Sequence, residues 1–230
     1  MNYRILALAL AATGCNVWWL HATQAKNKAV ENPVKSEIEV KFFVDRSDFE
    51  QRLQNVGAVL ATPRRLMRRQ VFDFPAALRK EGMEQVGRVR DEGDKITMTL
   101  KEYKKPRTMD NVKEIEIVVN NFDAAAKILE LSGYESNSYQ ENYRTSWKLQ
   151  GASVEIDEWP GMRVYAEIEA SSTEELKRIA ALLGVAEERF MCLNLFALYE
   201  RELGLDAKKM RNQPRLTFEN IEQVKKELKA

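Results

Sequence analysis

Residues 37–41 read Glu37-Ile38-Glu39-Val40-Lys41, and the way this short stretch alternates decides the fold. Side chains of a β-strand point to its two faces in turn, so the two glutamates and the lysine share one face. The isoleucine and the valine share the other face. An ordinary half-buried strand turns its apolar face to the core and a mixed polar face to water. A face that carries only charges is the first sign of another arrangement.

The same alternation returns in five later segments, where charged or hydroxyl side chains alternate mainly with aliphatic ones. Their polar members are Arg88 and Arg90, Thr97, Thr99 and Lys101, Glu114 and Glu116, Glu155 and Asp157, and Arg163, Tyr165, Glu167 and Glu169. A solvated face of an open sheet is the alternative for any single strand. Such a face rarely separates carboxylate pairs from Arg and Lys pairs strand by strand. We therefore expect the sheet to close with its charges inside, where ion pairs, a metal or a ligand must offset their burial.

A unit of strand, helix and glycine occurs three times and supports one compact architecture. The strands contain Glu37, Glu114 and Glu167, and the predicted helices span 47–56, 123–131 and 172–183. Ser47 with Glu50 and Ser172 with Glu175 fit the capping box, and Asp123 is a suitable N-cap. Further strands are predicted over 66–74, 87–90, 95–101, 143–149 and 153–157. The sequence thus predicts an α+β protein whose antiparallel eight-stranded β-barrel forms a tunnel flanked by helices.

The chain divides into three expected parts. Residues 36–204 form the tunnel domain, and residues 205–230 form a tail with one amphipathic helix near 218–228, supported by Glu222 and Lys226 at i, i+4 spacing. Residues 1–35 are an extension whose apolar run indicates a signal peptide, a lipoprotein-like anchor or a disordered segment. We expect the protein to be cytoplasmic. Membrane contact is expected only if residues 1–25 are retained as an anchor.

Composition excludes several classes of protein. The chain is 44% hydrophobic and 31% charged, which indicates a folded core rather than disorder. Its 36 basic and 35 acidic residues give a net charge of +1, so no nucleic-acid partner is expected, and the basic run 64–69 reads as a strand entry. The two cysteines, Cys15 and Cys192, do not have the spacing of a zinc site or of a disulfide framework. The single histidine, His21, lies outside the patterned region, so we expect neither a His/Cys zinc site nor catalysis by histidine. Oxygen ligands alone favour Mg²⁺ or Mn²⁺, and basic side chains with carboxylate-held metal suit a polyphosphate.

The order of these motifs resembles the CYTH superfamily, the triphosphate tunnel metalloenzymes. That superfamily includes class IV adenylate cyclases, thiamine triphosphatases and inorganic triphosphatases. Its opening signature, E-x-E-x-K, fits residues 37–41 fully, and the resemblance covers residues 36 to about 200. The later matches follow in sequence order: Arg88 and Arg90, Lys101, Glu114 and Glu116, Arg144, Asp157, Glu167 and Glu169.

The resemblance implies roles for these residues. The triphosphate would be bound by Lys41, Arg68, Arg88, Arg90, Lys101 and Arg144, with Arg69 an equal candidate for the place of Arg68. Metal would be held by Glu37, Glu39, Glu116, Asp157, Glu167 and Glu169, with Glu114 in support. Glu37, Glu39 and Lys41 are the expected catalytic residues. One metal would orient the triphosphate and a second would position the nucleophile.

Departures from the family pattern bear on the subtype. Asn142 stands where the family often has a basic residue, Glu158 follows Asp157 where thiamine triphosphatases often have a lysine, and the His-Phe of the cyclases is missing. These differences favour a metal-dependent triphosphate hydrolase. A class IV adenylate cyclase with stacking from Phe72, Tyr103, Trp147 or Tyr165 is the first alternative. A non-catalytic polyphosphate- or nucleotide-binding module is the second. The loop 103–110 is either a mobile lid or a plain solvated turn.

Overall fold

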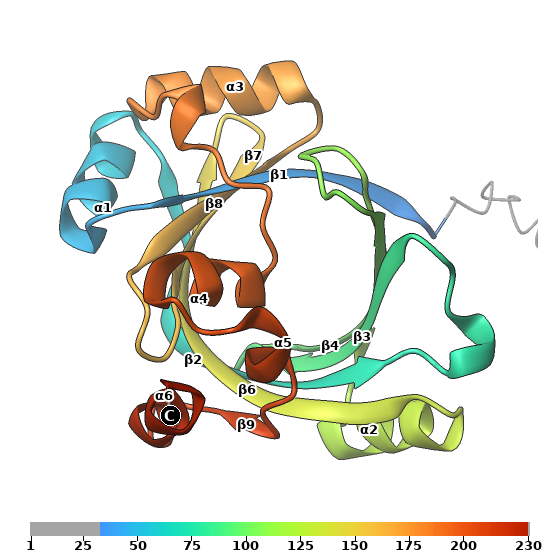
Figure 1. Ribbon diagram of the computed structural model, residues 1–230. Helices are drawn as coiled ribbons and strands as arrows, with labels where there is room; N and C mark the ends of the chain where they lie inside the picture. Colours follow the sequence, from blue (N-terminus) through green and yellow to red (C-terminus); the bar gives the residue numbers. More distant parts are fainter. Residues whose placement is uncertain (1–32, 230) are drawn as a thin grey trace, which may run out of the picture. The chain divides into compact units, whose positions relative to one another are not determined.

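Eight antiparallel strands close into a barrel in the computed structural model, which describes residues 33–229. The order around the barrel is β2-β3-β4-β5-β1-β8-β7-β6, and β2 pairs with β6 to close it (Figure 1). The short β9 (Arg215–Leu216) adds to β6 in parallel. The strands are β1 (Lys35–Phe43), β2 (Val59–Asp73), β3 (Met83–Asp91), β4 (Ile96–Lys104), β5 (Val112–Val119), β6 (Glu135–Leu149), β7 (Ala152–Glu158) and β8 (Tyr165–Ala170). The predicted α+β fold and eight-stranded antiparallel barrel are confirmed. The expectations for residues 1–32, including Cys15 and His21, lie outside the described part.

Six α-helices accompany the barrel in residues 33–229. They are α1 (Arg46–Asn55), α2 (Phe122–Leu131), α3 (Thr173–Leu182), α4 (Leu195–Leu203), α5 (Ala207–Arg211) and α6 (Ile221–Lys229), with 3₁₀ turns η1 (Ala76–Leu78) and η2 (Glu187–Arg189). No helix within this range has the length and apolar content that crossing a bilayer requires.

Two of the three predicted helix starts are wrong by two residues. Ser172 caps α3 as predicted, but Asp45 caps α1 in place of Ser47, and Asn121 caps α2 in place of Asp123. Asp45 and Asn121 are strong capping residues themselves, and their side chains accept from Asp48 N and Ala124 N at the first turn. The earlier of two suitable caps therefore begins each helix.

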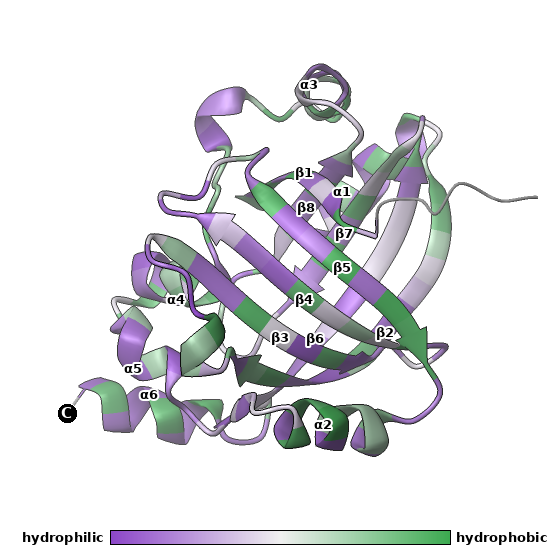
Figure 2. Cartoon of the chain, turned by 90° about the vertical axis from the view of Figure 1, so that its right-hand side faces the viewer, coloured by the Kyte–Doolittle hydropathy of each residue, from purple (hydrophilic) through white to green (hydrophobic). Residues whose placement is uncertain are grey.

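The barrel carries its apolar core on the outside. Val40 and Phe42 of β1, with Val154, Ile156 and Ile168 of β7 and β8, are fully buried against α1 and α3. On another part of the wall α2 covers Phe72 and Val89. Figure 2 shows the alternation of hydrophobic and hydrophilic residues along β3, β4 and β5. Because the helices cover the apolar faces, the charged faces are left to line the interior.

Residues 205–230 contribute to a further apolar cluster on the barrel. Leu205, Met210, Leu216, Ile221 and Val224 are buried in it. They pack with side chains of the preceding barrel and α4, namely Trp159, Met162, Tyr165, Met191, Leu198 and Tyr199. The expected helix in this segment is α6, but Glu222 pairs with Lys225 at 3.0 Å rather than with Lys226.

Candidate functional site

The interior has one wall rich in carboxylates and another rich in guanidinium groups. On the acidic wall β1 pairs with β8 so that Glu39 lies opposite Glu169 and Lys41 opposite Glu167. On the basic wall Arg69 of β2 lies opposite Arg90 of β3. Strand alternation puts the remaining predicted residues on the same interior face. These are Glu37, Arg88, Lys101, Glu114, Glu116, Arg144 and Asp157.

Arg68 is the one predicted site residue that the structure places elsewhere. Its side chain is 49% exposed, lies over the Phe122 ring and pairs with Asp91 at 3.0 Å on the outer face. Arg69, the alternative, is buried in the interior, where its guanidinium donates to Asn142 Oδ1 at 2.6 Å and lies over the Trp159 ring. The placement of Arg68 in the interior is therefore wrong, and Arg69 is the residue of this pair that lies there.

Arg144 and Asp157 form the most completely paired group of the interior. The guanidinium donates to both carboxylate oxygens at 2.8 and 2.6 Å, and the Asp157 side chain is 0% exposed. Asn142 Nδ2 adds a third bond to Asp157 at 2.9 Å. Burial opposes the charge of Arg144, but Asp157 and the nearby Glu155 and Glu167 outweigh it and raise the pKa of the guanidinium well above its usual value. This pair holds β6 and β7 in register.

The other three arginines are less well neutralised. Burial lowers the pKa of Arg90 to about 10, with repulsion from Arg88 and Arg144, against the attraction of Glu92. Burial lowers the pKa of Arg69 well below its usual value, again with repulsion from Arg88, Arg90 and Arg144. The buried Nε atoms of Arg69 and Arg88 have no acceptor among the described residues. The basic wall is thus a cluster of donors with spare capacity for an anion.

On the acidic wall three carboxylates surround one cation. Lys101 Nζ contacts Glu37 and lies 3.9 Å from Glu39 and 3.6 Å from Glu114. Burial raises the pKa of Glu37, and repulsion from Glu114 adds to this against the attraction of Lys101. Burial, with repulsion from Glu37 and Glu167, also raises the pKa of Glu169. Negative charge is therefore in local surplus here.

The donor set fits a divalent cation of the Mg²⁺ or Mn²⁺ class. It consists of carboxylate oxygens only, and Glu114 Oε2 is buried without a hydrogen-bond donor in the described chain. Within residues 33–229 no three acidic, histidine or cysteine side chains are already spaced to enclose an ion. Lys101 Nζ lies among Glu37, Glu39 and Glu114, which shows that these carboxylates can surround one positive charge.

Lys41 pairs with two carboxylates of the acidic wall. Its ammonium donates to Glu167 at 2.6 Å and to Glu39 at 3.0 Å. Burial opposes its charge, but Glu167 outweighs it and raises the pKa of Lys41. Burial also opposes the charge of Glu167, yet Lys41 and Arg144 hold the pKa of that carboxyl well below its usual value.

Several interior residues were missed from the sequence. Glu92, expected in a turn, is only 4% exposed and accepts from Arg90 at 2.6 and 3.0 Å, with Arg65 3.6 Å away. Arg107 extends from the β4–β5 loop into the interior and contacts Glu39. The alternation of Arg88 and Arg90, continued one residue past the end of β3, reaches position 92, so the burial of Glu92 had a signal. A loop residue such as Arg107 has no periodic signal.

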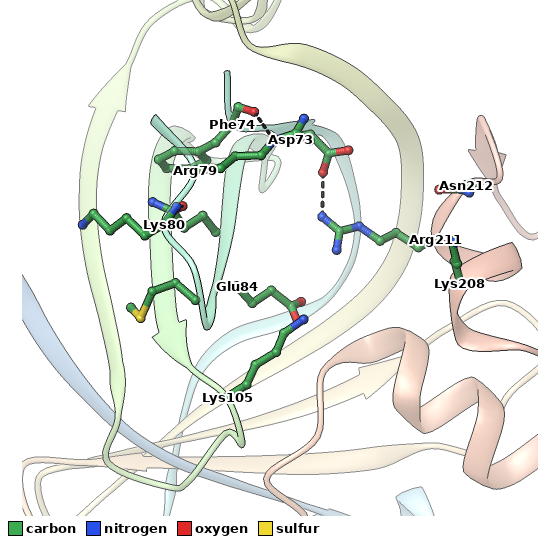
Figure 3. Close-up of a pocket in the computed structure, with 11 residues that line it drawn as sticks. Asp73, Phe74, Arg79, Lys80, Glu84, Lys105, Lys208, Arg211 and Asn212 are labelled. Atoms are coloured by element: carbon green, nitrogen blue, oxygen red, sulfur yellow. Dashed lines mark hydrogen bonds and ion pairs between the residues drawn. The ribbon is translucent and has the colours of Figure 1, made fainter. Parts of the chain in front are cut away.

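A basic cavity of about 410 Å³ lies where α5 meets the end of β2 and the start of β3 (Figure 3). In it Arg211 donates to Asp73 at 2.6 Å, and Lys105 lies 3.7 Å from Glu84. None of the predicted site residues lines this cavity. Its lining consists of Asp73, Phe74, Arg79, Lys80, Met83, Glu84, Gln85, Lys105, Lys208, Arg211 and Asn212.

Comparison with solved structures finds the same fold in other organisms. A conserved hypothetical protein from Pyrococcus furiosus is 22% identical with a TM-score of 0.60, covering 71% of this chain and 99% of its own. The PH1012 protein of Pyrococcus horikoshii is 22% identical with a TM-score of 0.60, covering 70% and 98%. A candidate adenylate cyclase from Vibrio parahaemolyticus is 17% identical with a TM-score of 0.59, covering 72% and 98%.

Among curated proteins no sequence matches this chain. The family model of the CYTH domain, in contrast, matches residues 35–191, which include every interior residue named above and all eight barrel strands. The E-x-E-x-K strand, the basic wall and the closed barrel agree with that match, and the chain belongs to the CYTH domain family.

Proposed function

We propose that this protein is a metal-dependent hydrolase of a triphosphate-bearing substrate, either inorganic triphosphate or an organic triphosphate, acting inside the barrel. The observation that carries the proposal is the cluster of Arg69, Arg88, Arg90 and Arg144 on one interior wall. Buried like charges are unfavourable unless a counter-charge is bound. A polyanion whose oxygens accept from several guanidinium groups at once supplies that counter-charge.

The arginines would bind and orient the phosphate chain. Arg69 and Arg88 have free buried Nε donors, and Arg90 has a Glu92 partner that can hold the guanidinium in position. Lys41 and Lys101, on the opposite side, keep their own carboxylate partners and would neutralise the reacting end. Catalysis of phosphoryl transfer consists largely of such positioning and charge neutralisation.

Glu37, Glu39 and Glu114 are the residues that would hold the metal, with Glu116 and Glu169 beside them. When bound by these carboxylates, Mg²⁺ or Mn²⁺ would add positive charge beside the phosphoryl oxygens and would make a nearby water more acidic. Asp157 and Glu167 instead keep Arg144 and Lys41 in place through their ion pairs. In the reaction a water oxygen bonds to the terminal phosphorus and the bridging P–O bond breaks, giving orthophosphate, a diphosphate and a proton.

Hydrolysis is favoured over cyclisation by the placement of the aromatic residues. Phe72 and Trp147, two candidates for stacking on adenine, are buried in the outer apolar clusters. The Tyr165 hydroxyl accepts from Trp159 Nε1 at 3.0 Å, and Tyr103 lies under the Arg107 guanidinium. The cytoplasm, where triphosphates are abundant, is the proposed location of this reaction.

The test is a substrate panel on the full chain. Inorganic triphosphate, ATP and thiamine triphosphate are each incubated with Mg²⁺ or Mn²⁺ after chelator treatment, and orthophosphate and cyclic AMP are measured. We expect orthophosphate release that needs added metal. Cyclic AMP from ATP would replace the hydrolase by a class IV adenylate cyclase. Tight binding of all three without any product would replace it by a binding module.

A further inference from the structure

The β4–β5 loop fills a gap in the barrel wall. β1 pairs with β5 only through Lys35, Ser36 and Glu37. Beyond this point Glu39 N donates to Met109 O of the loop at 2.8 Å, and Lys41 exchanges backbone hydrogen bonds with Met191. The loop thus continues the wall beside the acidic residues. It is docked against β1 rather than extended into solvent.

Internal hydrogen bonds give this loop a defined shape. Asn111 Nδ2 donates to the carbonyls of Lys104 and Pro106, each at 2.9 Å. Asn111 Oδ1 accepts from Thr108 N at 3.0 Å. The short segment between these anchors therefore presents the side chain of Arg107 on a fixed backbone, aimed at the interior.

Arg107 lies in the loop between β4 and β5, and its side chain is largely buried. Its side chain is 11% exposed, its guanidinium contacts Glu39, and it lies 5.0 Å from the centroid of the Tyr103 ring. Burial lowers the pKa of Arg107, only partly opposed by Glu167 and Glu37. A loop arginine at such a depth needs a carboxylate partner to offset its lost hydration.

Glu39 is faced by three cations, and they are not equivalent. Lys41 also pairs with Glu167, and Lys101 also contacts Glu37, so each keeps a carboxylate when Glu39 turns to another ligand. Glu39 is the only carboxylate that pairs with Arg107 within 4 Å among the described residues. A divalent cation that takes Glu39 therefore removes the sole partner of Arg107.

We propose that Arg107 is a resting-state substitute for the catalytic metal, which occupies Glu39 in the metal-free protein and is displaced when a divalent cation binds. This inference rests on the proposed function, because it concerns the same carboxylates. Under this proposal, a bound metal weakens the contact of Arg107 with Glu39, and that contact in turn weakens the binding of the metal. Reciprocal coupling of this kind is typically worth a factor of about 5 to 150 in affinity.

The experiment is a titration of the full-length, metal-free chain with Mn²⁺ alone, followed by the loss of the free-ion electron paramagnetic resonance signal. Arg107→Ala and Arg107→Gln remove the competing charge, and Lys105→Ala is the matched control. Lys105 is on the same loop and carries the same charge, but it lies near Glu84 rather than Glu39. We expect both Arg107 variants to bind Mn²⁺ at least about fivefold more tightly than wild type, and the control to stay within about twofold.

Unchanged or weaker Mn²⁺ binding in both Arg107 variants overturns the inference, with circular dichroism confirming that each is folded. The two proposals fail in different ways. Wild type that hydrolyses triphosphate but shows no gain on removal of Arg107 refutes only the role of Arg107. Wild type that binds no Mn²⁺ and turns over no triphosphate refutes both.

Discussion

Arg69 of β2 and Arg90 of β3 are register partners, so two guanidinium groups lie on the same interior face of neighbouring strands. Like charges placed directly opposite on a sheet are destabilising. Glu92 contacts Arg90, whereas Arg69 has an amide, Asn142, as its hydrogen-bond partner. The barrel therefore carries unfavourable charge at Arg69, which the proposed polyanionic substrate would relieve.

Replacing this arginine should separate stability from binding. Arg69→Met keeps the volume and removes the poorly neutralised charge, so the free energy of unfolding without ligand should be at or above the wild-type value, within about 1 kcal/mol. Affinity for triphosphate should fall about 10-fold to 100-fold, since a hydrogen bond to a charged group is worth roughly 1.5–3 kcal/mol. Urea denaturation and calorimetry measure the two quantities.

The neighbouring Arg68→Ala is the matched control for this substitution. Its side chain is exposed on the outer face, so triphosphate affinity should not change and stability should move by less than about 1 kcal/mol. A loss of affinity in Arg68→Ala equal to that in Arg69→Met would contradict the corrected assignment.

Arg144→Ala should have the opposite effect on stability. It leaves Asp157 fully buried with only Asn142 as a side-chain donor, and breaking a buried ion pair from one side costs about 3–5 kcal/mol. Urea denaturation without ligand measures the change. Arg163→Ala, which removes an exposed partner of Glu202, should cost less than about 1 kcal/mol. Equal losses in the two variants would refute the special position of the Arg144–Asp157 pair.

Glu37 should make the metal-free protein less stable as the pH rises. Its pKa is raised above the usual 4.5, so the folded chain binds this proton more tightly than the unfolded chain does. The stabilising effect of that proton is fully present below pH 4.5 and is lost as the pH rises through the folded pKa. Glu37→Gln cannot titrate at this position, so its stability should fall less over the same range in chelator. Parallel pH profiles of the two proteins would be evidence against the buried surplus of negative charge.

Turnover should depend on the acidic wall more than binding does. Glu37→Gln and Glu169→Gln should each lower kcat by about 100-fold or more with the fold intact, because each removes charge that acts on the reacting end. Arg90→Ala should chiefly raise KM. Glu158→Gln is the control, because Glu158 pairs outside the barrel with Arg46 and Arg64. Wild-type kinetics in all three interior variants would end the site assignment.

The alternating strands made much of this structure predictable. When charged residues alternate with apolar ones along a strand, all the charged side chains point either into the barrel or out of it. The apolar side chains of the opposite face then need helices to cover them. Residues such as Glu39, Arg90 and Asp157 could therefore be assigned together. The choice between Arg68 and Arg69 could not be made in this way. The pairing of β2 with β6 has register shifts between Leu60 and Arg65, so regular alternation cannot be followed along the whole of β2.

Features set by tertiary contact were beyond the sequence. Arg107 belongs to a loop whose conformation depends on docking against Glu39 N and on Asn111, neither of which gives a periodic pattern. The starts of α1 and α2 were misjudged because each offers two suitable capping residues in succession. Local chemistry allowed both residues in each case, and the structure uses the earlier one.

The pairing of β2 with β6, which closes the barrel, has a consequence for aggregation. An open sheet exposes two edge strands whose free amides and carbonyls recruit other chains, and proteins often guard such edges with lysine, proline or bulges. Here each of the eight barrel strands has a strand neighbour on both sides for at least part of its length, and β9 pairs with β6 through Tyr139 and Gln140. Closure thereby removes most of the free edge that an open sheet of these strands would present to other chains, and the ionic side chains can face inward instead of guarding an edge.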